Sequence, residues 1–164
     1  MPYKKHRQYR LPGYDYAQNG NYFITIVTRN REKHFGEIKD GKLKLSAVGR
    51  FTDNNFLALK INPLNVKVEE YTIMPDHLHL ILSIEHKGQA EGQIDGIHPL
   101  LRNSIPSFVN HLKGFIKRWC NKNGYPDFEW QMKYHDRIIR NDAEYDRILW
   151  YMQNNVINWE DDIP

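Results

Sequence analysis

The alternation of apolar and polar residues predicts a half-buried strand within MPDHLHLIL, residues 74–82. Leu78 and Leu80 fall on one face of such a strand, and His77 and His79 fall on the other. The leucine face has the character of a protein core. The opposite face presents two imidazoles about 7 Å apart along the strand, both pointing the same way. This geometry is suited to holding one ion between the two rings.

Similar patterns predict further strands. They cover YFITIVT at residues 22–28, residues 66–74, residues 77–84 after Pro75 and Asp76, and a short segment at 136–140. The stretch FGEIKDGKLKL contains Asp40-Gly41 between apolar residues, which is a strong signal for a type I′ hairpin.

Helical periodicity appears in three segments. Ser46 is suited to cap a helix that runs to about residue 60, and a second apolar stripe begins at Ser104 and ends near Gly124. Asn141 with Glu144 three residues later has the spacing of a capping box and predicts the start of a third helix. Residues 85–102 carry three glycines without apolar periodicity and are interpreted as a mobile loop.

The order of these elements predicts an α+β fold in which helices pack mainly on one face of an antiparallel sheet. The length of 164 residues is typical of one domain, spanning 1–164. A single cysteine, Cys120, excludes an internal disulfide and favours the reducing cytoplasm. Because no apolar run approaches about 18 residues, we expect neither a membrane span nor secretion.

Positive charge is concentrated locally, although the formal net charge is only +3. One basic group lies near the N-terminus and a second lies within the predicted helix that begins at Ser104. The candidate contacts to a polyanion are Lys4, Lys5, Arg7, Arg10, Lys113, Lys117 and Lys122. A solvated surface and a nucleic-acid contact explain such groups equally well.

The last helix combines an apolar arc with a polar arc. At about 100° per residue, Arg147, Tyr151 and Asn155 share one side with Glu144, and Tyr151 and Asn155 lie one turn apart. Taken alone, Tyr151 is interpreted as an aromatic residue at the edge of the core. Two strand histidines alone are more often surface or packing residues than ligands.

The combination changes this interpretation. An asparagine oxygen from a helix across the histidine face would complete mixed nitrogen and oxygen ligation by His77, His79 and Asn155. Such ligation, with positions left open for substrate phosphate, is typical of Mg²⁺ or Mn²⁺.

Four blocks of the chain, in this order, resemble the REP-associated tyrosine transposases, which are single-tyrosine HUH enzymes. The blocks are YRLPGYDYAQNGNYFITIVTRNR with FGEI, then YTIMPDHLHLIL, then WQMKYHDRIIRN, and finally ILWYMQNN. The resemblance implies a ferredoxin-like or RRM-like fold, metal binding by His77 and His79, and a nucleophilic Tyr151. It also implies that Asn155 completes the metal site. Members of this family cut and rejoin hairpin-forming single-stranded DNA through a 5′-phosphotyrosine.

The chain departs from the family pattern at two positions. Asp76 stands where asparagine is usual, and Val156 stands where proline commonly follows the asparagine. Tyr134 is a rival nucleophile, although its pattern places it before a strand and not on a helix. Residues that could stack on unpaired bases are Tyr14, Tyr16 and Trp130.

Two other functions compete with strand transfer. One is a domesticated binding module for single-stranded or hairpin DNA that has lost catalysis. The other is a rolling-circle initiator or relaxase, which the short chain disfavours. Because each chain would supply one phenol, two cuts need either two protomers or two sequential reactions, so a homodimer is compatible with this chemistry but not required by it.

Overall fold

The computed structural model describes residues 14–16, 18–59, 66–85 and 104–159. The strands are β1 (Gly20–Val27), β2 (Gly36–Lys39), β3 (Lys42–Leu45), β4 (Val66–Ile73), β5 (His77–Ile84) and β6 (His135–Ile139). The helices are α1 (Ala47–Leu59), α2 (Ile105–Lys122) and α3 (Asp142–Asn154), and a 3₁₀ turn, η1 (Arg29–Arg31), follows β1. Most of the predicted loop at 85–102 and the basic residues Lys4, Lys5, Arg7 and Arg10 lie outside the described residues.

The main sheet has four strands in the order β4-β5-β1-β6, and every neighbouring pair is antiparallel. Helix α1 connects β1 to β4 through the β2–β3 hairpin, and α2 connects β5 to β6. Each connection skips one strand of the sheet, which makes two split β-α-β units. The predicted α+β fold with an antiparallel sheet is therefore confirmed, and its topology is ferredoxin-like.

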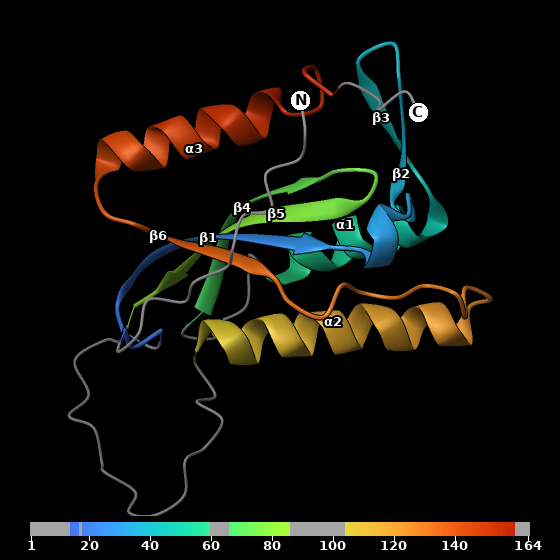
Figure 1. Cartoon of the computed structure of the whole chain (residues 1–164), viewed down its shortest axis with the longest axis horizontal. Coiled ribbons are helices and arrows are strands. Elements are labelled where there is room, and N and C mark those ends of the chain that lie inside the picture. Colours follow the sequence, from blue (N-terminus) through green and yellow to red (C-terminus); the bar gives the residue numbers. More distant parts are fainter. Residues whose placement is uncertain (1–13, 17, 60–65, 86–103, 160–164) are drawn as a thin grey trace, which may run out of the picture.

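The helices form layers on both sides of this sheet (Figure 1). Helices α1 and α2 cover one face, and α3 lies alone across the other. The α1 and α2 face carries the larger core cluster, which includes Leu78, Leu80 and Leu82 of β5. A smaller cluster of Ile81, Ile139, Ile148 and Met152 joins α3 to the opposite face. The sheet separates the main core from the face that carries the histidines.

Local sequence signals explain where the elements begin and turn. Asp40 and Gly41 both have positive φ, 53° and 69°, as the predicted hairpin requires. The Ser46 hydroxyl accepts a hydrogen bond from the Gly49 amide at 3.0 Å at the start of α1. The Ser104 side chain caps α2 by accepting a bond from the Ser107 amide, and Gly124 just beyond that helix has a φ of 88°.

The predicted cap of α3 also forms. The Asn141 side chain accepts a hydrogen bond from the Glu144 amide at 2.8 Å, and the Glu144 carboxylate accepts one from the Arg140 amide at 3.0 Å. The second bond reaches one residue further back than an ordinary capping box does. No helix in the described part of the chain is long and apolar enough to span a membrane.

Candidate active site

His77 and His79 lie side by side on the α3 face of β5. Their side chains are almost fully buried, with 7% and 4% of their surface exposed. The two Nε2 atoms are 3.1 Å apart, and the rings meet edge to face with centroids 4.6 Å apart. The alternation of β5 produces this arrangement, because the intervening Leu78 is fully buried in the core on the other side. The sequence-based placement of both imidazoles on one face is correct.

The far side of each ring is held by a polar partner. His77 Nδ1 lies 2.5 Å from Asp76 Oδ1, and His79 Nδ1 lies 2.9 Å from Thr25 Oγ1. Thr25 occupies the position of β1 that is paired with His79 in the antiparallel ladder. Because both Nδ1 atoms are engaged, both Nε2 atoms are directed at one another. Partners of this kind fix the orientation of a histidine and raise its basicity as a ligand.

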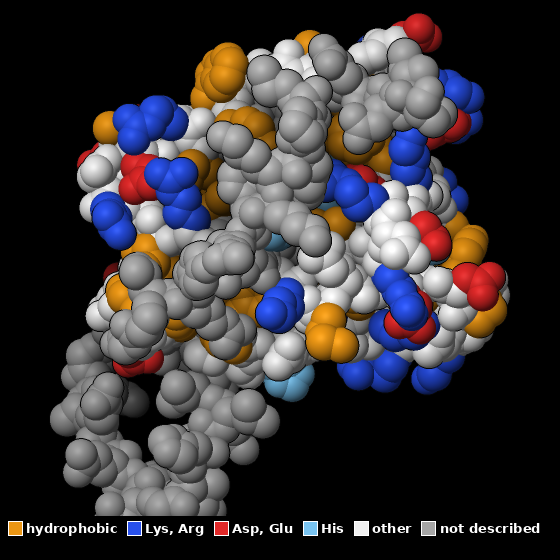
Figure 2. Space-filling view, in the orientation of Figure 1, with side chains coloured by type: hydrophobic (Ala, Val, Ile, Leu, Met, Phe, Trp, Pro, Cys, Tyr) orange, Lys and Arg blue, Asp and Glu red, His pale blue; other side chains and the backbone are white. Residues whose placement is uncertain are grey.

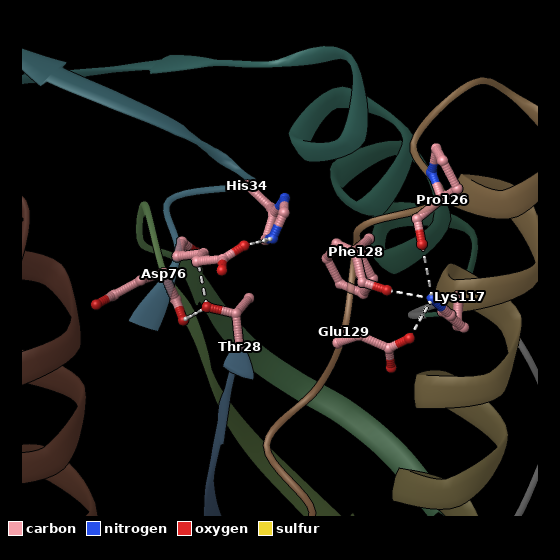
Figure 3. A network of polar contacts seen from close by, with 8 residues as sticks. Thr28, His34, Asp76, Lys117, Pro126, Phe128 and Glu129 are labelled. Carbon is pink, nitrogen blue, oxygen red and sulfur yellow. Dashed lines mark hydrogen bonds and ion pairs between the residues drawn. The ribbon is translucent and has the colours of Figure 1, made fainter. Parts of the chain in front are cut away.

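Asp76 is anchored from two directions. Its backbone carbonyl accepts hydrogen bonds from the amide and the hydroxyl of Thr28, each at 3.0 Å. Figure 3 shows the bond from the hydroxyl. The second carboxylate oxygen of Asp76 lies 2.9 Å from Arg31 Nε. Arg31 belongs to η1, where Asn30 and Arg31 both have a φ of 55°. This left-handed turn brings the guanidinium to the β4–β5 connection.

These contacts determine which groups carry charge. Burial alone would raise the pKa of Asp76, but the hydrogen bond from His77 and the charges of His77 and Arg31 outweigh it and lower that pKa. The carboxylate is therefore ionised at neutral pH, so His77 Nδ1 must donate to it. Burial, with the neighbouring His77, holds the pKa of His79 well below 6.5. His79 is thus neutral at neutral pH, which is the form that binds metals.

Tyr151 lies on the same side of the sheet as the imidazoles. The centroid of its ring is 5.5 Å from that of His79, and 47% of its surface is exposed. Phe23 of β1 stacks on His79 at 5.2 Å and meets Tyr151 edge to face at 6.5 Å. The phenol therefore stands at the open border of the buried histidine pair, in aromatic contact with both His79 and Phe23.

Asn155 follows Tyr151 by one turn and is the C-terminal cap residue of α3. Its side chain is half-buried. The amide nitrogen is buried and has no hydrogen-bond partner among the described residues. Such a donor is uncommon in folded proteins, and the atom of this side chain that could ligate a cation is the other one, the amide oxygen.

These residues fit a divalent cation. Two metal–nitrogen bonds of about 2.1 Å at a right angle separate the nitrogens by about 3 Å, close to the spacing seen here. His79 can place its proton on Nδ1, since the Thr25 hydroxyl can accept as well as donate, and this leaves both Nε2 lone pairs available. No group of three or more His, Cys, Asp or Glu side chains suited to a metal occurs in the described residues. Among the described residues, the side-chain oxygen of Asn155 is a candidate third ligand.

The rival nucleophile lies elsewhere. Tyr134 is 9% exposed and belongs to the larger core cluster on the α1 and α2 face. Trp130, a sequence-based candidate for base stacking, packs against Phe35 and Phe128 and donates its indole N–H to the Lys113 carbonyl at 3.0 Å. Tyr134 and Trp130 are thus both packed against other side chains of the protein, away from the histidine face.

Two of the predicted DNA-binding lysines are engaged within the protein. Lys117 Nζ contacts the carbonyls of Pro126 and Phe128 and lies 2.8 Å from Glu129 Oε1 (Figure 3). Lys113 Nζ donates to the carbonyls of Gln131 and Met132, at 2.8 and 3.3 Å. Both side chains tie α2 to the segment that leads into β6, on the face opposite the histidines. Lys122 is exposed at the end of α2.

Several residues around the site were not anticipated from the sequence. Thr25 and Phe23 reach His79 through strand pairing, and Arg31 reaches Asp76 through a tight turn. Neither arrangement leaves a local sequence signal. Trp159, beyond α3, places its ring 6.1 Å from that of His77. Asp76 had a visible signal, because a carboxylate directly before the first histidine is a natural partner for it.

Comparison with known proteins places this geometry in context. No family model matches the chain. A Haemophilus influenzae protein described as uncharacterized is 33% identical over 165 residues, which cover 95% of this chain and 91% of that protein. A solved structure of a REP-associated tyrosine transposase bound to a REP hairpin superposes with a TM-score of 0.60 and 19% identity. It covers 90% of this chain and 71% of the transposase chain. The two proteins therefore share a fold.

Proposed function

We propose that this chain, which belongs to the same family as the Haemophilus influenzae protein, is a metal-dependent strand transferase acting on single-stranded DNA. Its substrate would be a hairpin-forming or palindromic DNA, as in the complex formed by the transposase of the same fold. The intermediate would be a 5′-phosphotyrosine on Tyr151, and the cation would be Mg²⁺ or Mn²⁺.

One observation carries this proposal. The partly exposed ring of Tyr151 contacts the buried ring of His79, and His79 Nε2 lies 3.1 Å from His77 Nε2. Each Nδ1 has a polar partner, and the two Nε2 atoms meet at 3.1 Å, which is hydrogen-bonding distance and also close to the spacing of two nitrogen ligands on one cation. A structural role would not require the Tyr151 side chain to stay 47% exposed at the border of the histidine pair.

The reaction would proceed by in-line displacement at phosphorus. The Tyr151 oxygen forms a bond to the phosphorus while the bond from phosphorus to the 3′ oxygen breaks, and the phenolic proton is balanced by protonation of the released 3′ oxygen. One phosphodiester replaces another, so the step is close to isoenergetic and the same site can rejoin strands. Phe23 and His79 would hold the phenol ring in line, because they contact it from the sheet.

The cation would be held by His77, His79 and Asn155, with Asp76 and Thr25 orienting the two imidazoles. When bound there, it supplies a positive charge that polarises the phosphate and stabilises the charge developing on its oxygens. A free tyrosine phenol, with a reference pKa of about 10, is a poor nucleophile at neutral pH, so the reaction needs this electrophilic assistance.

The test is a covalent adduct. The protein is incubated with Mn²⁺ and a 5′-labelled or 3′-labelled single strand carrying a palindrome, and the products are separated on a denaturing gel. We expect a protein–DNA band that carries only the label 3′ to the cut, and that Tyr151→Phe abolishes. Tyr134→Phe is the matched control and should retain the band, because Tyr134 belongs to the core cluster on the other face of the sheet.

The outcomes separate the competing functions. A band that survives Tyr151→Phe would reject Tyr151 as the nucleophile. Tight binding of the palindrome without any adduct, across several palindromic sequences, would favour the catalytically silent binding module instead.

A further inference from the structure

A second polar site lies beside the first, at the edge strand β6. A pocket of about 500 Å³ opens there, a size within the range of small-ligand sites. Its charged and aromatic lining consists of Tyr16, Asp136, Arg137, Arg140, Glu144 and Arg147. Figure 2 shows Lys and Arg side chains, with Asp and Glu between them, at the end of the molecule where α3 begins. We call this site the arginine pocket.

The three guanidinium groups of the arginine pocket have different surroundings. Arg137 lies 2.5 Å from Glu144, whose carboxylate also accepts the Arg140 amide, so this arginine is already neutralised. Arg140 and Arg147 are exposed, and no ion pair or hydrogen bond of their guanidinium groups occurs among the described residues. The lining therefore carries three guanidinium groups against the two carboxylates of Glu144 and Asp136, and Arg140 also acts on Glu144 through its charge. The remaining excess of positive charge favours an anionic ligand.

The position of Arg147 relates this pocket to Tyr151. The two residues are four apart on α3, so they lie on the same side of the helix about 6 Å apart along its axis. A DNA strand whose reacting phosphate lies at Tyr151 would therefore reach the arginine pocket within a few nucleotides. Tyr16 adds a planar ring to the wall, held in place by edge-to-face packing on Tyr14 at 5.0 Å. An aromatic wall suits an unpaired base.

We propose that the arginine pocket binds an unpaired nucleotide of a single-stranded DNA segment that continues past the reaction site. Arg140 and Arg147 contact its phosphates and Tyr16 contacts its base. This inference rests on the proposed function for the identity of the polymer. It adds a binding role for Arg147, which, like Glu144, lines the pocket and precedes Tyr151 on the polar side of α3. The strand is thereby positioned by α3 itself, the helix that carries the nucleophile.

The test measures how binding depends on salt. The affinity for a fluorescent single-stranded DNA 20-mer without a palindrome is measured at four salt concentrations, in EDTA so that no cleavage occurs. Each lost phosphate contact lowers the slope of log K against log salt by about 0.7. We expect the double variant Arg140→Gln/Arg147→Gln to lose about 1.4 of that slope. Arg118→Gln, which changes an exposed arginine on the opposite face, should leave it unchanged.

A second double variant and a competitor test whether charge and nucleic acid are what the pocket requires. Arg140→Lys/Arg147→Lys retains both charges and should restore the slope; failure to restore it would indicate a structural role and overturn the proposal. Equal competition by poly-glutamate and by single-stranded DNA of the same charge would assign the pocket to acidic protein segments instead. An unchanged slope in the glutamine double variant, or no binding of the 20-mer by the wild type, would also overturn it.

These measurements do not depend on the chemistry at Tyr151. They can be repeated with Tyr151→Phe, which should bind the 20-mer with the wild-type slope. If no covalent adduct is found but the salt slope still depends on Arg140 and Arg147, DNA binding by the arginine pocket is supported and only the strand-transfer proposal is rejected.

Discussion

At the scale of single residues, Asp76 has the most varied role in the candidate site. Its backbone carbonyl fixes the end of β1 through Thr28, and its carboxylate joins Arg31 on one oxygen to His77 on the other. The carboxylate is 5% exposed, so its charge acts in a poorly solvated environment. An asparagine at this position could accept the same hydrogen bond from His77 but would not attract Arg31 or increase the basicity of the imidazole.

Replacing this carboxylate tests its effect on the metal. We expect Asp76→Asn to weaken Mn²⁺ binding by about 10- to 100-fold, since carboxylates that hydrogen-bond histidine ligands have effects of this size. Isothermal titration calorimetry in the absence of DNA measures it without reference to activity. Asp53→Asn is the control, because that carboxylate bonds Tyr71 at 2.8 Å, away from the histidines. Equal Mn²⁺ affinities of the wild type and Asp76→Asn, with both folded by circular dichroism, would contradict the proposed role.

At the scale of elements, α3 packs on the smaller of the two core clusters. It meets the sheet through a cluster of four buried residues, whereas α1 and α2 share the larger core. Its first turn is correspondingly well capped by Asn141 and Glu144. Since α3 carries Tyr151, Asn155 and Arg147, the end contacts of this helix determine where the proposed nucleophile stands.

The cap of α3 gives a stability that depends on pH. The backbone hydrogen bond from Arg140 lowers the pKa of Glu144, with a further contribution from Arg137. A carboxyl group with a lowered folded-state pKa stabilises the fold at pH values above its unfolded pKa, here 4.5, and this stabilisation is lost as the pH falls further. We therefore expect Glu144→Gln to destabilise the protein by about 1 kcal/mol or less at pH 7, and by progressively less below pH 4.5.

Urea unfolding at pH 7, 5, 4 and 3 measures this difference, because the other carboxyl groups are common to both proteins and cancel. Asp142→Asn changes an exposed carboxylate in the same first turn and serves as the control. A difference between the wild type and Glu144→Gln that stays constant from pH 7 to pH 3 would show that the charge of Glu144 does not stabilise the helix.

At the scale of the whole molecule, the sequence predicts the sheet and its helices better than it predicts the site. The period of β5 and the caps of α2 and α3 are local patterns, so they could be read directly. His79 and Thr25 meet across 54 positions of the chain, and only the register of β1 against β5 brings them together. The arginine pocket likewise combines β6, α3 and Tyr16, and its charges form no local pattern until the fold assembles them.

The sheet also separates the candidate site from the larger core cluster. The histidines, Tyr151 and the arginine pocket lie toward α3 and the β6 edge. Lys113 and Lys117 lie toward α2, where their ammonium groups bind backbone carbonyls of residues 126–132. The sequence favours neither DNA contact nor solvation for these lysines, and the structure adds an internal role that would compete with phosphate binding.

Replacing Lys117 distinguishes these roles. We expect Lys117→Met to lower the free energy of unfolding by about 1–3 kcal/mol, because the Phe128 carbonyl loses its charged donor. We expect the salt slope for single-stranded DNA to remain at the wild-type value, since the ammonium is already bound within the protein. Lys122→Met, in the exposed last turn of the same helix, should leave the stability unchanged. Flattening of the slope by about 0.7 in Lys117→Met would instead place DNA on the α2 face, and a bound strand would then have to pass around the β6 edge to reach Tyr151.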